Sequence, residues 1–377
     1  MRVLLSILPA ALIVLTTLAG EPPPVLPLGS SAPDFKLPGA DGRTYRLKSF
    51  AKAKYLVVIF TCNHCPTAQA YEERIKQLVT DYKSRGVAFV AINPNSPHGV
   101  RLDELGYTDV DDTMASMKIR AKQRSFNFPY LDDGPTEKVS RQYGPVATPH
   151  VFIFDEQRKL RYQGRIDDNE RESLVKKRDT REALDALLTG REPAVTQTKV
   201  FGCSTKWDEK SDGNARWMEK VRGEAVTVTA ADAVMLKELR ANKSGKVRLV
   251  NFWATWCGPC VAEFDDLIET NLRFRHRDFE LVTVAAQFPD ERDKILAFLK
   301  QHHASTRNLL FGTGDKYALM EAFDSGWNGG LPYTLLLGPG GEVLYKKSGE
   351  IDFLELRRRI VPALNQITPW PGMAEAK

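Results

Sequence analysis

Two cysteines separated by two residues are the part of this sequence best suited to chemistry. Cys257 and Cys260 follow an apolar run at residues 247–252 and enclose the dipeptide Gly-Pro. We expect a buried strand that turns into a helix at Cys257, where the helix dipole and the free backbone N–H groups favour a thiolate. Cys257 is then the expected nucleophile. Cys260, one turn further along, can close a disulfide with it.

A zinc site and a purely structural disulfide are the alternatives for this pair. Zinc needs four ligands, and the nearest candidates in sequence, His302 and His303, do not complete a site of good spacing. A Cys-x-x-Cys motif beside alternating strands and helices favours redox exchange instead. We therefore predict a redox-active disulfide, with no metal and no separate cofactor.

The segment Trp-Ala-Thr-Trp-Cys-Gly-Pro-Cys at residues 253–260 resembles the active site of the thioredoxin superfamily. Within that superfamily it is most similar to the exported thioredoxin-like reductases of the cytochrome c maturation type. The resemblance implies an α/β fold with a central mixed β-sheet flanked by helices. Trp253 and Trp256 are expected to pack and shield the site.

The proton acceptor of this site departs from the thioredoxin pattern. Asn251 stands where thioredoxin carries a buried Asp, and an amide cannot take the proton from the second thiol. Glu263 follows the Cys pair in the same helix. It either substitutes for that Asp or is an acid favoured there only by the helix N-terminus.

A second Cys-x-x-Cys pair, Cys62 and Cys65, follows another apolar run at residues 55–60. Apolar residues at helical spacing come next, so this pair also lies at a helix start. His64 between the sulfurs can lower the pKa of a nearby thiolate and make this pair more oxidising than one flanked by Gly-Pro. The alternative is a solvated side chain without influence. His150 fits either the core or the rim of a site.

The two halves of the chain repeat one order of elements, which indicates duplication of one fold. Each half has a strand, a Cys pair, a helix, a second strand, further helices, an X-Pro pair, a hairpin and a last helix. Cys62 is matched with Cys257 in this comparison. After the first Cys pair and its helix we expect a strand at residues 87–92, helices at 113–124 and 137–143, a hairpin at 151–162 and a last helix at 170–188. After the second Cys pair and its helix we expect a strand at 281–286, helices at 293–302 and 315–323, and a hairpin at 334–345.

The first half also resembles the redoxin branch, which includes alkyl hydroperoxide reductase and thiol-specific antioxidant proteins. The resemblance rests on Ala-Pro-Asp-Phe-Lys-Leu at residues 32–37 and Thr-Pro-His-Val-Phe-Ile-Phe-Asp at 148–155. A thiol peroxidase in which Cys62 attacks peroxide is therefore a competing interpretation. Neither Cys62 nor Cys65 has the Pro-x-x-x-Thr/Ser-x-x-Cys pattern that peroxidases of this kind need. A third interpretation is a metal-binding or metal-delivery module that uses Cys62, Cys65 and a histidine.

The superfamily resemblance assigns roles to two prolines. It implies that Pro149 and Pro332 are cis and lie against the sulfurs. It also implies that the preceding residues, Thr148 and Leu331, offer backbone groups to the extended chain of a partner protein. We expect partner specificity to lie around these residues and in the polar insertion at residues 93–112.

A fifth cysteine, Cys203, lies in the connector segment Val-Phe-Gly-Cys-Ser-Thr-Lys-Trp at residues 200–207. The apolar start of this segment suggests that it docks on another part of the protein. Three roles stay open for Cys203: a resolving thiol for Cys62, an intermolecular link, or an inert buried residue, as free cysteines commonly are.

The length of 377 residues suits two domains, and 42% hydrophobic with 27% charged residues is ordinary for a globular protein. A net charge of +5 without a Lys/Arg-rich block gives no indication of nucleic-acid binding. A charged start, an apolar middle and a small-residue exit predict a signal peptide, or a retained anchor. The expected parts are residues 1–20 (signal or anchor), 21–192 (redoxin-like domain), 193–221 (connector), 222–366 (thioredoxin-like domain) and 367–377 (tail).

The sequence thus predicts two tandem thioredoxin folds that act as an exported thiol-disulfide oxidoreductase, periplasmic or secreted. Its partners would be protein thiols and disulfides and an upstream electron donor, with a membrane involved only if the N-terminal segment is retained. Because Gly-Pro between thiols suits a reductant and Asn-His an oxidant, we expect electrons to pass from Cys257/Cys260 to Cys62/Cys65.

Overall fold

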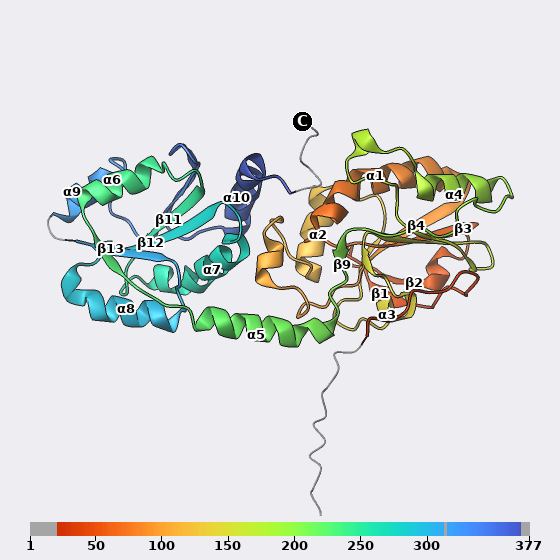
Figure 1. The fold of residues 1–377 in the computed structure, drawn as a ribbon, viewed down its shortest axis with the longest axis horizontal. Coiled ribbons are helices and arrows are strands. Elements are labelled where there is room, and N and C mark those ends of the chain that lie inside the picture. The colour runs from red at the N-terminus through yellow and green to blue at the C-terminus, as the bar shows by residue number, and fades with distance from the viewer. Residues whose placement is uncertain (1–20, 313–314, 371–377) are drawn as a thin grey trace, which may run out of the picture.

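The computed structural model describes residues 21–312 and 315–370, which form two domains placed next to each other (Figure 1). The expected signal peptide or anchor at residues 1–20 and most of the expected tail at 367–377 lie outside the described residues. Among the helices that the structure describes, none is long and apolar enough to cross a membrane.

The first domain is built on a mixed five-stranded sheet. Its strands and the small strands beside it are β1 (Lys36–Pro38), β2 (Thr44–Arg46), β3 (Tyr55–Phe60), β4 (Val87–Asn93), β5 (Tyr130–Asp132), β6 (Ala147–Thr148), β7 (His150–Phe154) and β8 (Leu160–Gly164). The order is β5-β4-β3-β7-β8, with β3, β4 and β5 parallel and the β7–β8 hairpin antiparallel. Every residue of the central strand β3 is buried, as expected for a strand covered on both faces.

Helices and a hairpin cover the two faces of this sheet. The helices are α1 (Pro66–Tyr82), α2 (Met114–Gln123), α3 (Ser140–Tyr143) and α4 (Asp179–Leu188), with the 3-10 helices η1 (Leu47–Phe50), η2 (Lys83–Arg85), η3 (Leu102–Leu105) and η4 (Glu172–Leu174). Val57 and Ile59 of β3 pack with α1, α2 and α4 on one face. Leu56, Val58 and Phe60 pack on the other face, with α3 and β1. The alternation of side chains along β3 therefore builds two cores.

The helix predicted at residues 137–143 is shorter than the sequence indicates. It begins only at Ser140, because the carboxylate of Asp133 accepts the backbone N–H groups of Val139 and Ser140 at 3.0 and 2.6 Å. Glu137 has a φ of 53°, in the left-handed region, which is incompatible with a helix at that residue. The prediction is wrong for the first three residues of this range.

The helix predicted at residues 170–188 begins only at Asp179, and a loop with one 3-10 turn replaces its first half. This loop wraps around α1. Arg74 donates to the carboxylate of Asp167 at 2.9 and 2.7 Å, and Tyr71 donates to the same carboxylate at 2.6 Å. Arg74 also donates to the carbonyl oxygens of Asn169, at 2.8 Å, and of Glu170, so a side chain of α1 satisfies backbone groups where the helix was expected to begin.

The second domain is built on a six-stranded mixed sheet. Its strands are β10 (Thr229–Ala231), β11 (Val247–Trp253), β12 (Phe279–Ala285), β13 (Arg307–Phe311), β14 (Tyr333–Leu337) and β15 (Val343–Ser348), and its helices are α6 (Ala233–Ala241), α7 (Gly258–Phe274), η6 (Pro289–Glu291), α8 (Arg292–Gln301), α9 (Lys316–Phe323) and α10 (Phe353–Ile367). The order is β10-β13-β12-β11-β14-β15. The elements after β11 confirm the predicted order. β10 and α6 were not among the expected elements.

The central strand of this second sheet, β11, is buried on both faces. Val247, Leu249 and Trp253 pack with α7, α8 and α10. Val250 and Phe252 pack on the opposite face, with α6 and α9. Both domains thus have a mixed sheet between helices, which is the tandem thioredoxin arrangement that the sequence predicts.

The connector returns to the first domain before it reaches the second. Its elements are β9 (Cys203–Ser204), η5 (Asp208–Lys210) and α5 (Ser211–Arg222). β9 pairs antiparallel with β6 of the first domain, and α5 then runs from the first domain to the second (Figure 1). The prediction that the segment around Cys203 docks is confirmed, and its docking surface is the first domain.

The insertion at residues 93–112 packs against the second domain. Arg277 donates to the carbonyl of Gly106 at 3.0 Å, and Arg358 donates to the carboxylate of Asp109 at 3.1 Å. The expectation that this insertion faces partner proteins is therefore wrong for this part of it. It joins the two domains instead.

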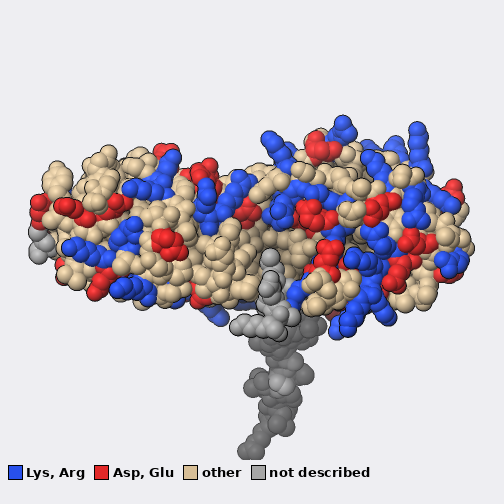
Figure 2. All heavy atoms as spheres, turned by 90° about the horizontal axis from the view of Figure 1, so that it is seen from above, with Lys and Arg blue, Asp and Glu red and all other residues tan. Residues whose placement is uncertain are grey.

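Charged side chains of both signs are interspersed over both domains. Figure 2 shows Lys and Arg next to Asp and Glu across the visible face, without a broad area of one sign. This distribution agrees with the small net charge of +5 and with a solvated surface.

Replacing Asp167 with Asn is expected to lower the free energy of unfolding of the first domain by about 3–5 kcal/mol. The substitution leaves the guanidinium of Arg74, which is only 7% exposed, without its ionic partner. Urea denaturation followed by circular dichroism measures the loss.

The matched control is Asp185→Asn. Asp185 and Arg85 form an ion pair whose side chains are 50% and 44% exposed, so its loss is expected to cost less than about 1 kcal/mol. Equal losses in the two variants would contradict the importance of the buried pair.

Candidate active site

The first Cys pair lies at the start of α1. Cys65 is the N-cap residue of this helix, and Pro66 follows it as the first helical residue. The sulfur of Cys65 accepts the backbone N–H of Ala68 at 3.4 Å. A sulfur in this position neutralises one of the free N–H groups of the helix end, and the helix dipole favours its thiolate form.

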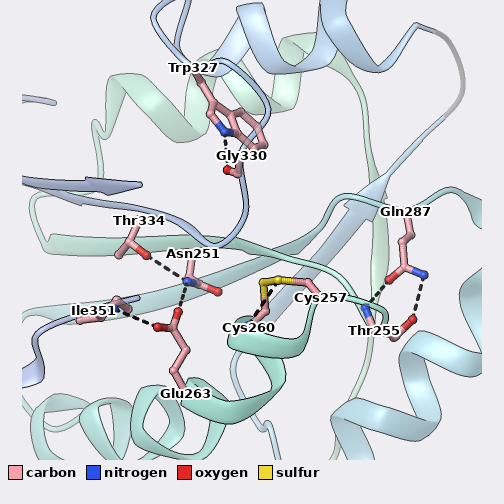
Figure 3. Close-up of a disulfide and its surroundings, with 10 residues drawn as sticks. All are labelled: Asn251, Thr255, Cys257, Cys260, Glu263, Gln287, Trp327, Gly330, Thr334 and Ile351. Atoms are coloured by element: carbon pink, nitrogen blue, oxygen red, sulfur yellow. Dashed lines mark hydrogen bonds between the residues drawn. A yellow bond between two sulfur atoms is a disulfide. The ribbon is translucent and has the colours of Figure 1, made fainter. Parts of the chain in front are cut away.

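The second Cys pair lies at the start of α7 and is a disulfide (Figure 3). Cys257 is the N-cap residue here, and its sulfur accepts the backbone N–H of Cys260 at 3.3 Å. Cys257 is 6% and Cys260 1% exposed, so an attacking thiol reaches Cys257 more readily. The geometry agrees with the role of nucleophile predicted for Cys257.

The two pairs are not equivalent in the fold. β3 and β7 place Phe60 opposite His150, and β11 and β14 place Phe252 opposite Tyr333. Counted from these positions, Cys65 corresponds to Cys257, since each lies five residues beyond the paired phenylalanine. The expected match of Cys62 with Cys257 is therefore wrong by three residues.

The position that Cys260 holds in the second domain belongs to Ala68 in the first. Cys62 lies one turn before the helix, where the second domain has Ala254. The second sulfur thus precedes the nucleophile position in the first domain and follows it in the second. This difference leaves each pair with different neighbours.

Both predicted prolines are cis. The bonds Thr148–Pro149 and Leu331–Pro332 have this form, as the resemblance implies. Thr148 lies against the first pair, because its hydroxyl is 3.2 Å from the sulfur of Cys62 and its carbonyl accepts from the thiol of Cys65 at 3.4 Å. Leu331 packs at the margin of the core cluster that contains the second pair.

His64 is buried and paired with an acid that the sequence did not indicate. Its Nδ1 is 2.6 Å from the carboxylate of Asp112, which also accepts the backbone N–H groups of Asn63 and His64 at 2.8 and 3.0 Å. Asn95 donates to the same carboxylate at 2.9 Å. The alternative of a solvated His64 is wrong, since the residue is 2% exposed.

The buried pair shifts the pKa of both partners. Burial alone would lower the pKa of His64, but the charge of Asp112 and their hydrogen bond outweigh it and raise that pKa. Burial alone would raise the pKa of Asp112, but the charge of His64 and the hydrogen bonds it receives lower that pKa below the ordinary value. The geometry therefore favours an ionised pair next to the thiols.

The pKa values of the two thiols of the first pair are shifted in opposite directions. Burial raises the pKa of Cys62, and the neighbouring Cys65 and Asp112 add to this effect. Burial also opposes ionisation of Cys65, but hydrogen bonds from the thiols of Cys203 and Cys62 and the charge of His64 hold the pKa of Cys65 well below its usual value. Cys65 is the expected thiolate of this site.

Cys203 packs against the cluster that contains Cys62 and Cys65, and its backbone hydrogen bond is to Cys65. Its backbone N–H donates to the sulfur of Cys65 at 3.3 Å. Cys203 is half-buried, whereas Cys62 and Cys65 are buried, so Cys203 is the most accessible of the three free thiols in the described residues. A hydrogen bond to Cys65 raises the pKa of Cys203, and burial adds to this effect.

Glu263 lies with Asn251 on the Cys260 side of the disulfide (Figure 3). Its carboxylate accepts the side-chain N–H of Asn251 at 3.4 Å and the backbone N–H of Ile351 at 2.9 Å. Asn251 also donates to the hydroxyl of Thr334 at 3.0 Å. Burial raises the pKa of Glu263 to about 7, well above that of an ordinary glutamate.

The two tryptophans before the disulfide differ. Trp253 is fully buried and packs with Phe264 and Phe298, so its predicted packing role is confirmed. Trp256 is 66% exposed, so it does not pack as expected. Position 256 lies on the turn into the helix, where its side chain points away from the core.

The remaining histidine candidates lie away from the sulfurs of the second domain or in the core. His302 pairs with Asp265 at 2.6 Å and packs on Phe298, so the zinc alternative at the second pair has no support among the described residues. His150 is buried, with its ring 2.8 Å from the side-chain oxygen of Gln163. Burial lowers the pKa of His150 to about 4, and the residue belongs to the core.

One group of potential metal ligands is present in the described part of the chain. The donor atoms of Cys62, His64 and Asp112 lie within 4.8 Å of one another, and all three residues are buried. The Nε2 atom of His64 is buried without a hydrogen-bond partner. The sequence analysis kept a metal-binding module with Cys62, Cys65 and a histidine as an alternative; the group in the structure contains Cys62 and His64, with Asp112 in place of Cys65.

Sequence reasoning missed Asp112 and Asn95, which complete the first site. Asp112 ends the polar insertion and lies 48 residues from His64, and no local pattern connects the two. The register difference did have a local indication. Pro66 directly after Cys65 is typical of the first helical position, whereas Gly258 stands between Cys257 and Pro259.

Protein-family models match both halves of the chain. Residues 28–163 match the AhpC/TSA family, and residues 221–354 match the Redoxin family. The two matches fall on the first and the second domain of the structure.

Named relatives belong to one class. The thiol:disulfide interchange protein CycY of Rhizobium leguminosarum bv. viciae is 32% identical over 122 residues, which cover 32% of this chain and 60% of CycY. The thiol:disulfide interchange protein HelX of Rhodobacter capsulatus is 29% identical over 143 residues, which cover 36% of this chain and 74% of HelX. The chain thus spans about 60% of the length of CycY. A solved structure of a hypothetical protein from Sinorhizobium meliloti 1021 is 33% identical, covers 49% of this chain and 97% of its own, and has a TM-score of 0.43.

Replacing Asp112 with Asn is expected to raise the pKa of Cys65, because His64 loses the neighbouring negative charge that keeps it protonated. The ultraviolet absorbance of the thiolate against pH measures this shift in protein that lacks Cys257 and Cys260. Asp111→Asn is the matched control, since Asp111 accepts from Thr113 and has no contact with His64. The same shift in both variants, or none in Asp112→Asn, would contradict the assignment.

Proposed function

The chain is a tandem of an AhpC/TSA-family domain and a Redoxin-family domain, and on this premise we propose that it is a thiol-disulfide oxidoreductase. The observation that carries the proposal is the Cys257–Cys260 disulfide at the start of α7. The printed names of CycY and HelX, both thiol:disulfide interchange proteins, support the same class.

The reaction at the second domain follows from the positions of its sulfurs. In the reduced state the thiolate of Cys257, held by the backbone N–H of Cys260, attacks one sulfur of a substrate disulfide. A mixed disulfide forms and the first substrate thiolate leaves. Cys260 then attacks the sulfur of Cys257 and releases the second substrate thiolate. Two electrons pass to the substrate, and the protein keeps the Cys257–Cys260 disulfide.

Cys260 must lose its proton before it attacks, and Glu263 is the proposed acceptor. With a pKa of about 7, Glu263 changes its protonation state in the range where a general base is effective. Asn251 cannot take a proton itself. Its amide instead positions the carboxylate, since it is fixed by Thr334 on the other side.

The first domain is proposed to be the more oxidising of the two. The thiolate of Cys65 receives N–H groups from Ala68 and Cys203 and lies next to the ionised pair of His64 and Asp112. Interactions that stabilise a thiolate stabilise the reduced state of its pair and raise its reduction potential. Electrons are therefore proposed to pass from Cys257/Cys260 to Cys62/Cys65.

The proposed partners are protein thiols and disulfides together with an upstream donor that reduces the second pair. We propose export on the charged and apolar pattern of residues 1–20. In an oxidising compartment a dithiol has to be kept reduced by such a donor. The disulfides are the redox groups, and no other cofactor is needed for this exchange.

Metal binding by the first domain is a second candidate, favoured by the buried group of Cys62, His64 and Asp112. Equilibrium dialysis of the reduced protein with zinc or copper tests it. One metal ion per chain, lost in Cys62→Ser, supports this candidate, and no binding removes it.

A thiol peroxidase is a further candidate, supported by the AhpC/TSA match. The geometry changes the residue expected to attack peroxide, because Cys65 and not Cys62 caps α1 and accepts the backbone N–H groups of Ala68 and Cys203. Peroxide consumption that persists in Cys62→Ser but is lost in Cys65→Ser supports this candidate. No turnover with a supplied reductant removes it.

Cys257→Ser is expected to abolish reduction of a model protein disulfide by the second domain, since it removes the nucleophile. Cys260→Ala is expected to accumulate a mixed disulfide at Cys257, which non-reducing electrophoresis detects. Full activity in Cys257→Ser protein that also lacks Cys62 would contradict the proposed function.

Glu263→Gln is expected to slow disulfide exchange by the second domain by about 10²-fold and to remove a rise in rate near pH 7. Because burial raises the pKa of Glu263, wild-type stability falls as the pH rises from the ordinary glutamate value to about 7. The Gln variant lacks this fall and should be more stable than wild type at pH 8, by about 1–3 kcal/mol.

The control is Asp265→Asn on the same helix, whose carboxylate is 81% exposed. This variant is expected to keep the wild-type dependence of rate on pH. Denaturation and stopped-flow kinetics across pH 5–9 measure both effects. A rate in Glu263→Gln that still rises near pH 7 would exclude Glu263 as the proton acceptor.

A further inference from the structure

The connector occupies the edge of the first domain where an extended peptide would bind. β9 pairs antiparallel with β6, with Cys203 opposite Thr148 and Ser204 opposite Ala147. A free strand edge beside a reactive group is a common docking place for extended partner segments. In the second domain, no strand of the described residues pairs with Leu331. The first domain thus holds a segment of its own chain at a place where none of the described residues adds a strand in the second domain.

Several contacts fix this segment in place. Gly202 has a φ of +135°, and a Cβ there would lie 2.1 Å from the carbonyl of Thr148, so only glycine allows the close approach. The hydroxyl of Thr205 donates to the carbonyl of Pro145 at 2.6 Å, and the backbone N–H of Lys206 donates to Asn95 at 2.9 Å. The side chain of Lys206 also pairs with Glu104 of the insertion. These contacts anchor both ends of the segment, so the position of Cys203 is built into the fold.

Three sulfurs meet at this place. Cys62 and Cys65 form a small buried cluster with Ala68, and Cys203 packs against it. The backbone N–H of Cys203 points at the sulfur of Cys65, at 3.3 Å. Cys65 therefore lies between two potential disulfide partners, one from its own motif and one from the connector.

Exposure separates the three thiols. Cys65 is 0% and Cys62 3% exposed, whereas Cys203 is half-buried and can be reached from solvent. Exchange requires an attacking sulfur to approach the disulfide directly, so access limits its rate. External thiols can reach Cys203 while the Cys62–Cys65 pair stays enclosed.

We propose that Cys203 is the exchange thiol of the first domain and connects the buried Cys62/Cys65 pair to external protein dithiols through a Cys65–Cys203 disulfide. The inference rests on the proposed thiol-disulfide exchange and adds the entry point for its substrate. A flexible or partner-bound connector is not required, because Cys203 already packs against the Cys62/Cys65 cluster and its backbone N–H is 3.3 Å from the sulfur of Cys65.

The steps balance in atoms and electrons. In the oxidised domain Cys65 is bonded to Cys62 and carries no negative charge that would oppose ionisation of Cys203. The Cys203 thiol loses its proton to solvent, its thiolate attacks the sulfur of Cys65, the Cys65–Cys203 bond forms, and Cys62 leaves as a thiolate that takes up a proton. A thiolate of an external protein dithiol then attacks the sulfur of Cys203. Cys65 leaves as a thiolate stabilised by the backbone N–H of Ala68. The second thiol of the substrate closes its own disulfide and releases Cys203, so two electrons have passed from the dithiol to Cys62/Cys65.

Disulfide mapping by mass spectrometry tests the central bond. The full chain with Cys62→Ser, Cys257→Ser and Cys260→Ser keeps only Cys65 and Cys203. This variant is treated with oxidised dithiothreitol. The expected product is an intramolecular Cys65–Cys203 disulfide. Cys65 and Cys203 that remain free, or that link only between molecules, would overturn the proposal.

A thiol moved by one residue is the matched control. In Cys203→Ser with Ser204→Cys the sulfur lies on the exposed side of β9, because neighbouring strand residues point to opposite faces. This variant should give little or no link to Cys65. A link as efficient as that of Cys203 would mean that the chain, and not the built geometry, brings the sulfurs together, and would overturn the proposal.

A rate measurement separates the relay from the proposed function. In the Cys257→Ser, Cys260→Ser background with Cys62 and Cys65 intact, reduction of the Cys62–Cys65 disulfide by dithiothreitol is expected to be at least about tenfold slower after Cys203→Ser. An unchanged rate would overturn the relay and leave the redox role of the pair standing. A Cys62–Cys65 disulfide that does not form in any variant would overturn both.

Discussion

A cysteine sulfur that caps a helix is the interaction on which both sites depend. In each domain it accepts the backbone N–H three residues further along, and the helix dipole supports its negative charge. The central sheets carry Cys65 and Cys257 to the same place in the fold, at the end of a fully buried strand. The two domains differ in the position of the second sulfur: Cys62 precedes the capping cysteine in the chain, and Cys260 follows it.

This difference explains why the two sites have different surroundings. In the second domain Cys260 lies inside the first turn of α7, so its environment comes from the helix and from the neighbouring strands, including Glu263. In the first domain Cys62 precedes α1, and the loop that carries it can be enclosed from outside. The insertion supplies Asp112 to His64 on one side, and the connector supplies Cys203 on the other. The same insertion contacts the second domain, so the segment that completes the first site also joins the domains.

The sequence was sufficient where local patterns determine structure. The buried strands, the helices that start at the Cys pairs, the hairpins after the cis prolines and the tandem fold all follow from apolar periodicity and from motif resemblance. It was insufficient where distant residues meet. Asp112 and Asn95 reach His64 from the insertion, and no local pattern shows that contact.

Two of the predictions made from the sequence fail for physical reasons that the structure shows. The two Cys-x-x-Cys motifs have the same spacing, but the helix starts at different cysteines. Pro66 starts α1 directly after Cys65, the second cysteine of its motif, whereas α7 starts directly after Cys257, the first cysteine of its motif. The helix expected at residues 170–188 fails in its first half because Arg74 and Tyr71 of α1 bind Asp167 in the preceding loop. In both cases a tertiary contact or a single proline outweighs the pattern.

The proposed electron transfer from Cys257/Cys260 to Cys62/Cys65 requires that the two pairs differ in reduction potential. Equilibration of full-length variants with dithiothreitol redox buffers measures this difference directly, with one variant retaining only Cys62/Cys65 and the other only Cys257/Cys260. Cys62/Cys65 is expected to have the higher reduction potential, because the thiolate of Cys65 is stabilised by His64 and by two backbone N–H groups. A potential of Cys62/Cys65 well below that of Cys257/Cys260 would contradict this expectation.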